Sequence, residues 1–223
     1  MACVTTMDTL QFKGAIIGMI LGDGSLSKLE KDRLNSRLAV TSVNKDYLDW
    51  KLSMMEHLTK VRINETSYEK THPTWQTLYK ATSMQHPSYT KLRMRMYHGE
   101  GRTIDTHIMK ALTPLGVLLW YLDDGSYEDK KTAISIYSNA YSYSDNMLMA
   151  KSMNDNFGLR FNVYQKFSKR EGKRYSHLYL AGKDRLKFYE NIIEPFIEKI
   201  PDSMMYKVPE KKKLIRLYKR MYE

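Results

Sequence analysis

The sequence predicts an α+β fold made of two copies of one unit. An apolar run that ends in an acidic turn occurs twice, as IIGMILGDGS at 16–25 and as VLLWYLDDGS at 117–126, so the final aspartates lie 101 residues apart. A second segment recurs at an offset of 100, Leu-Tyr-Lys-Ala at 78–81 and Leu-Tyr-Leu-Ala at 178–181. Because register is kept, we expect repeats at 1–105 and 106–223, each in the order α–β–β–α–β–β–α with an antiparallel sheet.

In the first repeat, the hydrophobic pattern predicts helices and strands in alternation, at 10–22 (helix), 25–29 and 35–42 (strands), 46–58 (helix), and 61–70 and 74–82 (strands). The stretch after Pro87 alternates basic and apolar residues as a strand would, yet Leu92 and Met96 also have helical spacing. We assign it to a helix, since the matching stretch at 184–193 has a helical pattern. Residues 97–112 are expected to join the copies.

In the second repeat, Thr113 and Pro114 supply a cap and a first-turn proline for a helix over 114–123. The elements expected after it are strands near 126–130 and 132–138, a helix over 144–157, and strands near 160–169 and 174–181. The last two strands are predicted to reverse at Glu171-Gly172.

The composition favours a polyanionic partner. The 223 residues include 36 Lys and Arg against 25 Asp and Glu, a net charge of +11, which favours nucleic acid first and an anionic membrane surface second. The single cysteine, Cys3, excludes an intrachain disulfide and suits a reducing compartment. The start lacks a secretory signal and no apolar run is long enough to span a bilayer. We expect a cytoplasmic protein of bacterial or phage origin, or an organelle-encoded one, which is neither secreted nor membrane-bound.

Three glycines of the first predicted helix, Gly14, Gly18 and Gly22, are spaced by four and line one face. A glycine inside a helix costs about 1 kcal/mol relative to alanine, so three on one face indicate close contact with another backbone. If that backbone is the helix of the second copy, Asp23 and Asp124 lie side by side at two helix C-termini, where the helix dipole disfavours negative charge. A divalent cation would offset this penalty and the mutual repulsion, and oxygen ligands favour Mg²⁺, with Mn²⁺ or Ca²⁺ as surrogates.

At these residues the chain resembles the LAGLIDADG homing endonuclease family in its single-chain, two-repeat form. The final Asp-Gly of the nine-letter motif aligns with 23–24 and with 124–125. Leu-Thr-Pro at 112–114 and Met-Met-Tyr-Lys-Val-Pro at 204–209 are also similar to monomeric members. The second copy departs from the motif because Leu119 stands at its third-position glycine, and Gly116 is the candidate to supply the small residue instead.

The resemblance implies a metal-dependent endonuclease that cuts both strands of a long asymmetric DNA site across the minor groove. It implies short 3′ overhangs and a role in the mobility of a host intron or intein. Asp23 and Asp124 would bind the metal, with the backbone carbonyls of Gly22 and Asp123, and each site would cut one strand. The motif helices would lie at the central interface and the two sheets would form a saddle over the DNA.

The resemblance also implies one cationic catalytic residue in each repeat, where related chains place a lysine. Lys207, before Val208-Pro209, matches that position directly. In the first repeat the corresponding residue is Arg102, which can stabilise negative charge but is a poor proton carrier.

DNA contacts are expected from the hairpin strands, since alternation separates polar, basic and aromatic residues from apolar ones and a two-stranded ribbon fits the major groove. The outward residues expected in the first repeat are Arg62, Asn64, Thr66, Tyr68, Lys70, Trp75, Thr77 and Tyr79. Those expected in the second repeat are Asn162, Tyr164, Lys166, Ser168, Tyr175, His177 and Tyr179.

Two other functions remain open for a chain of this kind. One is an RNA-binding maturase that helps a host intron to splice, and the other is a DNA-binding regulator that does not cut. Both would tolerate loss of the acidic pair, whereas Asp23 and Asp124 are retained. We therefore expect a monomer whose partner is double-stranded DNA, with intron RNA as a further candidate partner.

Overall fold

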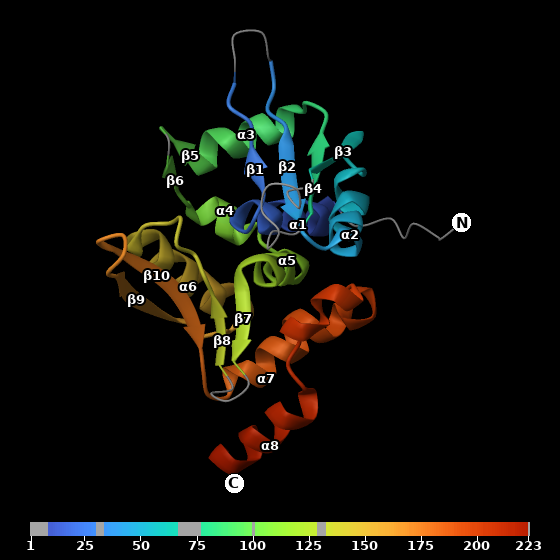
Figure 1. Ribbon diagram of the computed structural model, residues 1–223. Helices are drawn as coiled ribbons and strands as arrows, with labels where there is room; N and C mark the ends of the chain where they lie inside the picture. The colour runs from blue at the N-terminus through green and yellow to red at the C-terminus, as the bar shows by residue number, and fades with distance from the viewer. Residues whose placement is uncertain (1–8, 30–33, 67–76, 100, 129–132, 223) are drawn as a thin grey trace.

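The structure is a computed structural model that describes residues 9–29, 34–66, 77–99, 101–128 and 133–222 (Figure 1). Its elements form two halves with the same order, α–β–β–α–β–β–α, which confirms the predicted α+β duplication. Within the described ranges, no helix has the length and apolar character that crossing a bilayer requires.

The first half follows the predicted order with shorter strands. Its elements are α1 (Thr9–Leu21), β1 (Ser25–Leu26), β2 (Leu38–Ser42), α2 (Lys45–Met55), β3 (Val61–Thr66), β4 (Leu78–Ser83) and α3 (Pro87–Met96). The ambiguous stretch after Pro87 is therefore helical. The segment expected only to join the copies has structure of its own, the small hairpin β5 (Tyr97–His98) and β6 (Gly101–Arg102) followed by α4 (Thr106–Lys110).

The second half repeats the series and then continues. Its elements are α5 (Pro114–Asp124), β7 (Gly125–Glu128), β8 (Ala133–Ile136), α6 (Tyr143–Phe157), β9 (Asn162–Ser168), β10 (Lys173–Leu180) and α7 (Asp184–Phe188). A π-helical turn (Tyr189–Ile193), two 3₁₀ segments (Glu194–Lys199 and Asp202–Lys207) and α8 (Lys211–Tyr222) follow.

Local chemistry explains several of these boundaries. Thr113 caps α5 by accepting a hydrogen bond from the Gly116 amide at 3.3 Å, and Pro114 occupies the first turn. The hairpin between β9 and β10 reverses at Gly172, whose φ of +63° favours glycine. The cap and this turn both lie where the sequence places them.

Two antiparallel sheets flank the central helices α1 and α5 (Figure 1). Their strand orders are β1-β2-β4-β3 and β7-β8-β10-β9, so each sheet takes its strands from one half in an equivalent arrangement. Residues of the central helices, such as Ile17 and Leu118, are fully buried. Val40 and Leu178 on the inner faces of the sheets join the same core, which fixes the ends of α1 and α5 in the middle of the molecule.

Candidate active site

The central helices pack backbone against backbone through their glycines. A Cβ atom added at Gly18 would lie 2.0 Å from the Gly116 carbonyl oxygen, and one added at Gly116 would lie 2.2 Å from the Gly14 carbonyl oxygen. Only glycine allows such an approach. The predicted contact between the two motif helices is confirmed, and Gly116 does supply the small residue that position 119 lacks.

This packing brings the two motif aspartates together. Asp124 is the last residue of α5, and Asp23 lies in the turn just after α1. The Asp23 amide donates a hydrogen bond to Oδ2 of Asp123 at 3.2 Å, so the two helix ends adjoin. The prediction that both acids emerge at the same end of the helix pair is therefore confirmed.

The acids sit in an unfavourable electrostatic environment. Burial, followed by the negative charges of Asp23 and Asp123, raises the pKa of Asp124 to about 7. Partial desolvation and the charge of Asp123 also raise the pKa of Asp23, although its side chain remains exposed. A cation bound between them would therefore stabilise the ionised form of both carboxylates.

The donor set fits a hard divalent cation. Two carboxylates and the main-chain oxygens at the ends of α1 and α5 offer oxygen ligands only, which Mg²⁺ and Ca²⁺ prefer. Among the described residues, no group of three or more His, Cys, Asp or Glu side chains is placed to hold a metal ion. A metal site here would therefore rest on Asp23, Asp124 and main-chain oxygens.

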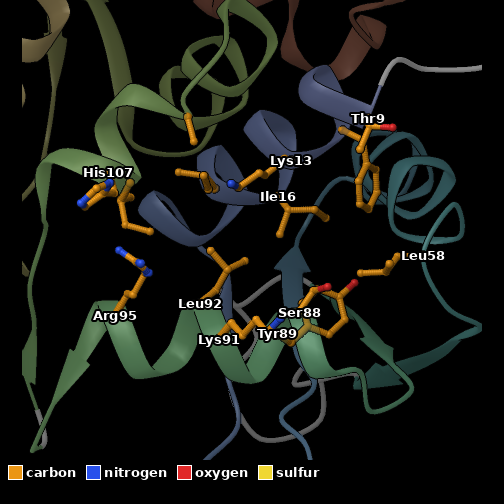
Figure 2. Close-up of a pocket in the computed structure, with 14 residues that line it drawn as sticks. Thr9, Lys13, Ile16, Leu58, Ser88, Tyr89, Lys91, Leu92, Arg95 and His107 are labelled. Carbon is orange, nitrogen blue, oxygen red and sulfur yellow. The ribbon is translucent and has the colours of Figure 1, made fainter.

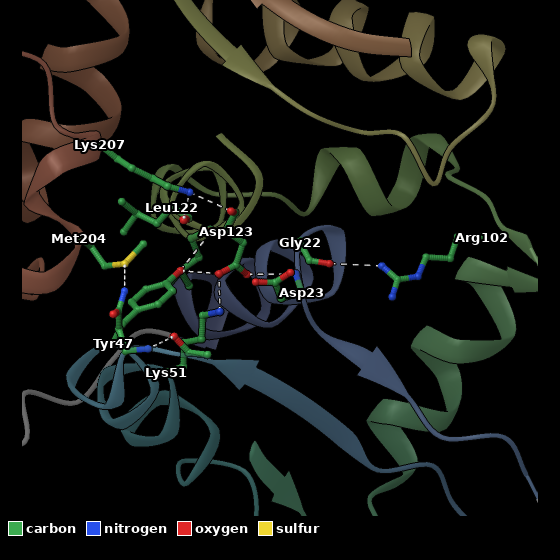
Figure 3. Close-up of polar contacts among 12 residues, drawn as sticks. Gly22, Asp23, Tyr47, Lys51, Arg102, Leu122, Asp123, Met204 and Lys207 are labelled. Carbon is green, nitrogen blue, oxygen red and sulfur yellow. Dashed lines mark hydrogen bonds and ion pairs between the residues drawn. The ribbon is translucent and has the colours of Figure 1, made fainter. Parts of the chain in front are cut away.

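The two predicted cations each hold the end of one motif helix (Figure 3). Arg102 donates hydrogen bonds to three carbonyl oxygens at the end of α1, those of Ile20 (3.0 Å), Gly22 (3.3 Å) and Gly24 (2.9 Å). Lys207 donates to two at the end of α5, those of Leu122 (2.6 Å) and Asp123 (2.9 Å). These cations offset the negative ends of the helix dipoles at equivalent places in the two halves.

Lys207 is itself held in place. Its backbone carbonyl accepts a hydrogen bond from the Tyr121 hydroxyl at 2.7 Å, which ties the C-terminal segment to α5. Burial lowers the pKa of its ammonium group, against the opposing effect of the three aspartates. The carbonyls of Gly22 and Asp123, the candidate metal ligands, each accept a hydrogen bond from one of the two cations and keep a second lone pair.

Sequence reasoning missed a buried network beside these groups. The Asp123 side chain forms an ion pair with Lys51, and both side chains are completely buried. Tyr47 donates a hydrogen bond from its hydroxyl to Oδ1 of Asp123 at 2.8 Å (Figure 3). One signal was present, because Tyr47 and Lys51 lie four residues apart on the face of α2 that also buries Leu48 and Met55.

An open pocket of about 480 Å³ adjoins Asp124. It joins residues from both halves, with Gly22 and Arg102 from the first and the segment 137–141 from the second. A larger pocket of about 600 Å³ lies between α1, α3 and α4 (Figure 2). Its lining contains neither motif aspartate, so it is separate from the acidic site.

The exposed face of the second sheet has the predicted composition. In the register of β9 and β10, Lys166 pairs with Tyr175, Tyr164 with His177, and Asn162 with Tyr179, so all lie on one face with Ser168. The rings of Tyr164 and His177 stack at 6.0 Å. Tyr137, which sequence reasoning did not select, extends this cluster with its ring 5.6 Å from that of His177.

The first sheet requires a correction. Asn64 pairs with Lys80 and Arg62 pairs with Thr82, whereas Tyr79 pairs with Glu65 and shares its face of β4 with the buried Ala81, two residues on. Tyr79 therefore lies on the core-side face, where it packs against the core. The prediction that it shares the outward face of Arg62 and Asn64 is wrong, and Lys80 and Thr82 take that place.

The structure describes only some of the residues predicted to contact DNA from the first hairpin. Thr77 is half-buried and lies just before β4, two residues from Tyr79 and so on the same side of the strand. Thr66 closes β3 opposite Leu78. Tyr68, Lys70 and Trp75 lie outside the described residues.

The duplicated fold, with an aspartate at the end of each of two glycine-packed central helices, defines a two-repeat LAGLIDADG protein. The chain belongs to the LAGLIDADG DNA endonuclease family, whose model matches residues 13–188.

Individual relatives are more distant. The chain is similar to protein RecA of Mycolicibacterium flavescens, with 27% identity over 210 residues that cover 86% of this chain and 45% of the relative. The chain thus spans less than half the length of that relative. It is also similar to the probable intron-encoded DNA endonuclease 3 of Mycosarcoma maydis, with 25% identity over 104 residues, 47% of this chain and 69% of the relative. The structure of the homing endonuclease I-WcaI bound to its DNA recognition sequence shares the fold, with a TM-score of 0.73 and 21% identity over 92% of this chain and 88% of that one.

Proposed function

We propose that this protein is a homing endonuclease that cuts both strands of a long asymmetric DNA duplex and so mobilises a host intron or intein. The observation that carries the proposal is the pair of aspartates, Asp23 and Asp124, with raised pKa values at the adjoining ends of the central helices. Two carboxylates that repel each other lower the stability of the fold, so their position here is explained better by a function than by stability. Family membership supports the endonuclease activity, and the DNA-bound I-WcaI structure supports a duplex target.

Asp23 and Asp124 are the groups that would hold the divalent cation, together with the carbonyl oxygens of Gly22 and Asp123. When bound, the cation supplies an activated water and stabilises charge on the attacking and leaving oxygens of the phosphodiester. In this proposal, each of the two aspartates serves the cleavage of one DNA strand. Asp124 is more deeply buried than the exposed Asp23, and this difference is compatible with two active sites that act independently.

Arg102 and Lys207 contribute positive charge in each half. Each donates hydrogen bonds to carbonyl oxygens at one helix end, beside the acids, and would stabilise negative charge on a phosphate bound there. Lys207, with its lowered pKa, is the better proton carrier of the two, because a guanidinium stays protonated. The two half-sites therefore differ in their cation as well as in the environment of their aspartate.

The exposed sheet faces would bind the duplex. On the second sheet, Lys166 and the aromatic cluster of Tyr164, His177 and Tyr179 combine a positive charge with hydrogen-bonding groups. On the first sheet, the face that holds Arg62, Asn64, Lys80 and Thr82 has similar chemistry. Such ribbons can enter the major groove, where side chains distinguish all four base pairs.

Selection from a random duplex library tests the proposal without knowledge of the target. The wild-type protein is incubated with the library and Mg²⁺, and duplexes that acquire double-strand breaks are captured and sequenced. We expect one long asymmetric consensus, and no enrichment with the Asp23→Asn/Asp124→Asn double variant. Absence of breaks from a folded protein, together with specific binding of intron RNA, would establish the maturase function instead.

A further inference from the structure

The two motif helices end differently. Position 22 of the first motif corresponds to position 123 of the second, yet one is glycine and the other aspartate. A Cβ atom added at Gly22 would lie 2.5 Å from Oδ2 of Asp123. The Asp123 side chain therefore occupies the space that a side chain at position 22 would need, and it does so across the boundary between the halves.

The carboxylate of Asp123 connects three parts of the molecule. Its Oδ1 accepts the Tyr47 hydroxyl at 2.8 Å and forms the ion pair with Lys51, both from α2 of the first half. Its Oδ2 accepts the amide of Asp23 at 3.2 Å. Since Lys51 neutralises it in a fully buried position, this carboxylate is oriented by the protein and does not face the open pocket.

The hydrogen bond that the Asp123 side chain accepts supports the backbone of Asp23 just after the end of α1. The amides of Gly22 and Gly24 are held by α1 carbonyls, those of Gly18 (3.1 Å) and Met19 (2.7 Å). The amide of Asp23, between them, is held by the Asp123 side chain. Asp124 needs no such support, because it lies within the last turn of α5.

We propose that the side chain of Asp123, oriented by Lys51 and Tyr47, positions Asp23 and not Asp124, a role distinct from that of the Asp123 backbone carbonyl. This role rests on the proposed endonuclease function. It makes the two half-sites structurally unequal, so that loss of the network slows cleavage of one strand. If the network only stabilised the contact between the two halves, its loss would slow cleavage of both strands equally.

The test uses two double variants that leave no unpaired charge in the core. Lys51→Met with Asp123→Leu replaces the buried ion pair with apolar groups of similar volume, a change that is often neutral for stability. Lys51→Met with Asp123→Asn is the matched control, since it keeps an oxygen that can accept the Asp23 amide. Urea unfolding confirms that each variant folds.

Two readouts follow on each variant. In the metal-free protein, hydrogen exchange at the Asp23 amide should be about tenfold faster in the Leu variant and close to wild type in the Asn variant. On a duplex selected with the wild-type protein, the Leu variant should lose about tenfold or more of nicking on the strand that Asp23→Asn no longer cuts, because small misplacements of reacting groups are costly. The other strand should change by less than about threefold, and the Asn variant should recover most of the loss.

Unchanged exchange at Asp23, or equal slowing of both strands, would overturn the positioning role. If the Leu variant does not fold, Tyr47→Phe removes one of the hydrogen bonds to Asp123 with little change in volume, and it should slow the same strand by a smaller factor. A wild-type protein that cuts no duplex would overturn the proposed function instead, whereas the exchange experiment tests the hydrogen bond independently of cleavage.

Discussion

Gly18→Ala is the sharpest perturbation of the central helix pair. The added Cβ would lie 2.0 Å from the Gly116 carbonyl oxygen, whereas carbon and oxygen make contact at about 3.3 Å. The helices must therefore separate by about 1 Å, since the obstacle is backbone. Overpacking of this kind costs about 3 kcal/mol at the upper end of the usual range, and the better helix propensity of alanine returns about 1 kcal/mol. We expect a net loss of about 2 kcal/mol in the free energy of unfolding.

Urea unfolding, followed by circular dichroism, measures this loss. Gly101→Ala is the matched control, because among the described residues its Cβ would meet only the His98 carbonyl oxygen, at 3.8 Å, and it should be neutral or slightly stabilising. Gly18→Ala should also slow nicking of both strands, since both aspartates are carried by this helix pair. A Gly18→Ala protein as stable as the wild type would refute the backbone-to-backbone packing.

Four further outcomes are expected. Lys51→Met alone should destabilise the protein by about 3 to 5 kcal/mol, because it leaves the Asp123 carboxylate buried without its cation, and urea unfolding should show most of this loss restored when Asp123→Leu is added. In chelator, wild-type stability should fall relative to Asp124→Asn as the pH rises from about 4 to about 7: the folded protein binds this proton more tightly than the unfolded chain, so ionisation destabilises the fold. Lys207→Ala and Arg102→Ala should each slow nicking of one strand more than they weaken binding, as a strand-resolved assay would show. Duplex affinity should fall by about 10³ to 10⁵ between 50 and 200 mM salt if roughly 6 to 10 phosphates are engaged, measured by fluorescence anisotropy.

For each of these four predictions, a specific result would contradict it. A Lys51→Met protein of wild-type stability would show that the ion pair is not buried. A stability difference for Asp124→Asn that is constant with pH would show that its pKa is not raised. Unimpaired nicking of both strands in either cation variant would remove that residue from the site. A nearly flat salt dependence would argue against the duplex-binding surfaces.

Most of the helical framework could be predicted from the sequence because long apolar periods are strong signals. The spacing of Gly14, Gly18 and Gly22 also predicted the helix contact, since glycine has few other reasons to recur on one face of a helix. The acids followed, because they sit directly at the ends of these helices.

The sheet faces and the buried network were harder for physical reasons. In β4, Tyr79 and Lys80 both suit an exposed face, and the residue that sets the phase is Ala81, whose small side chain gives a weak hydrophobic signal. A lysine on a helix is usually solvated, so the place of Lys51 on the apolar face of α2 was a weak signal without the position of its partner. That partner, Asp123, lies in the other half of the chain.

Strand-resolved cleavage of a selected duplex by Asp23→Asn and Asp124→Asn tests most directly whether each acid serves one strand. The two DNA strands carry different labels, and products are followed in Mg²⁺. The structure predicts that each single variant still nicks one strand, that the two variants nick opposite strands, and that the double variant nicks neither. Retention of full double-strand cleavage by either single variant, or nicking of the same strand by both, would contradict it.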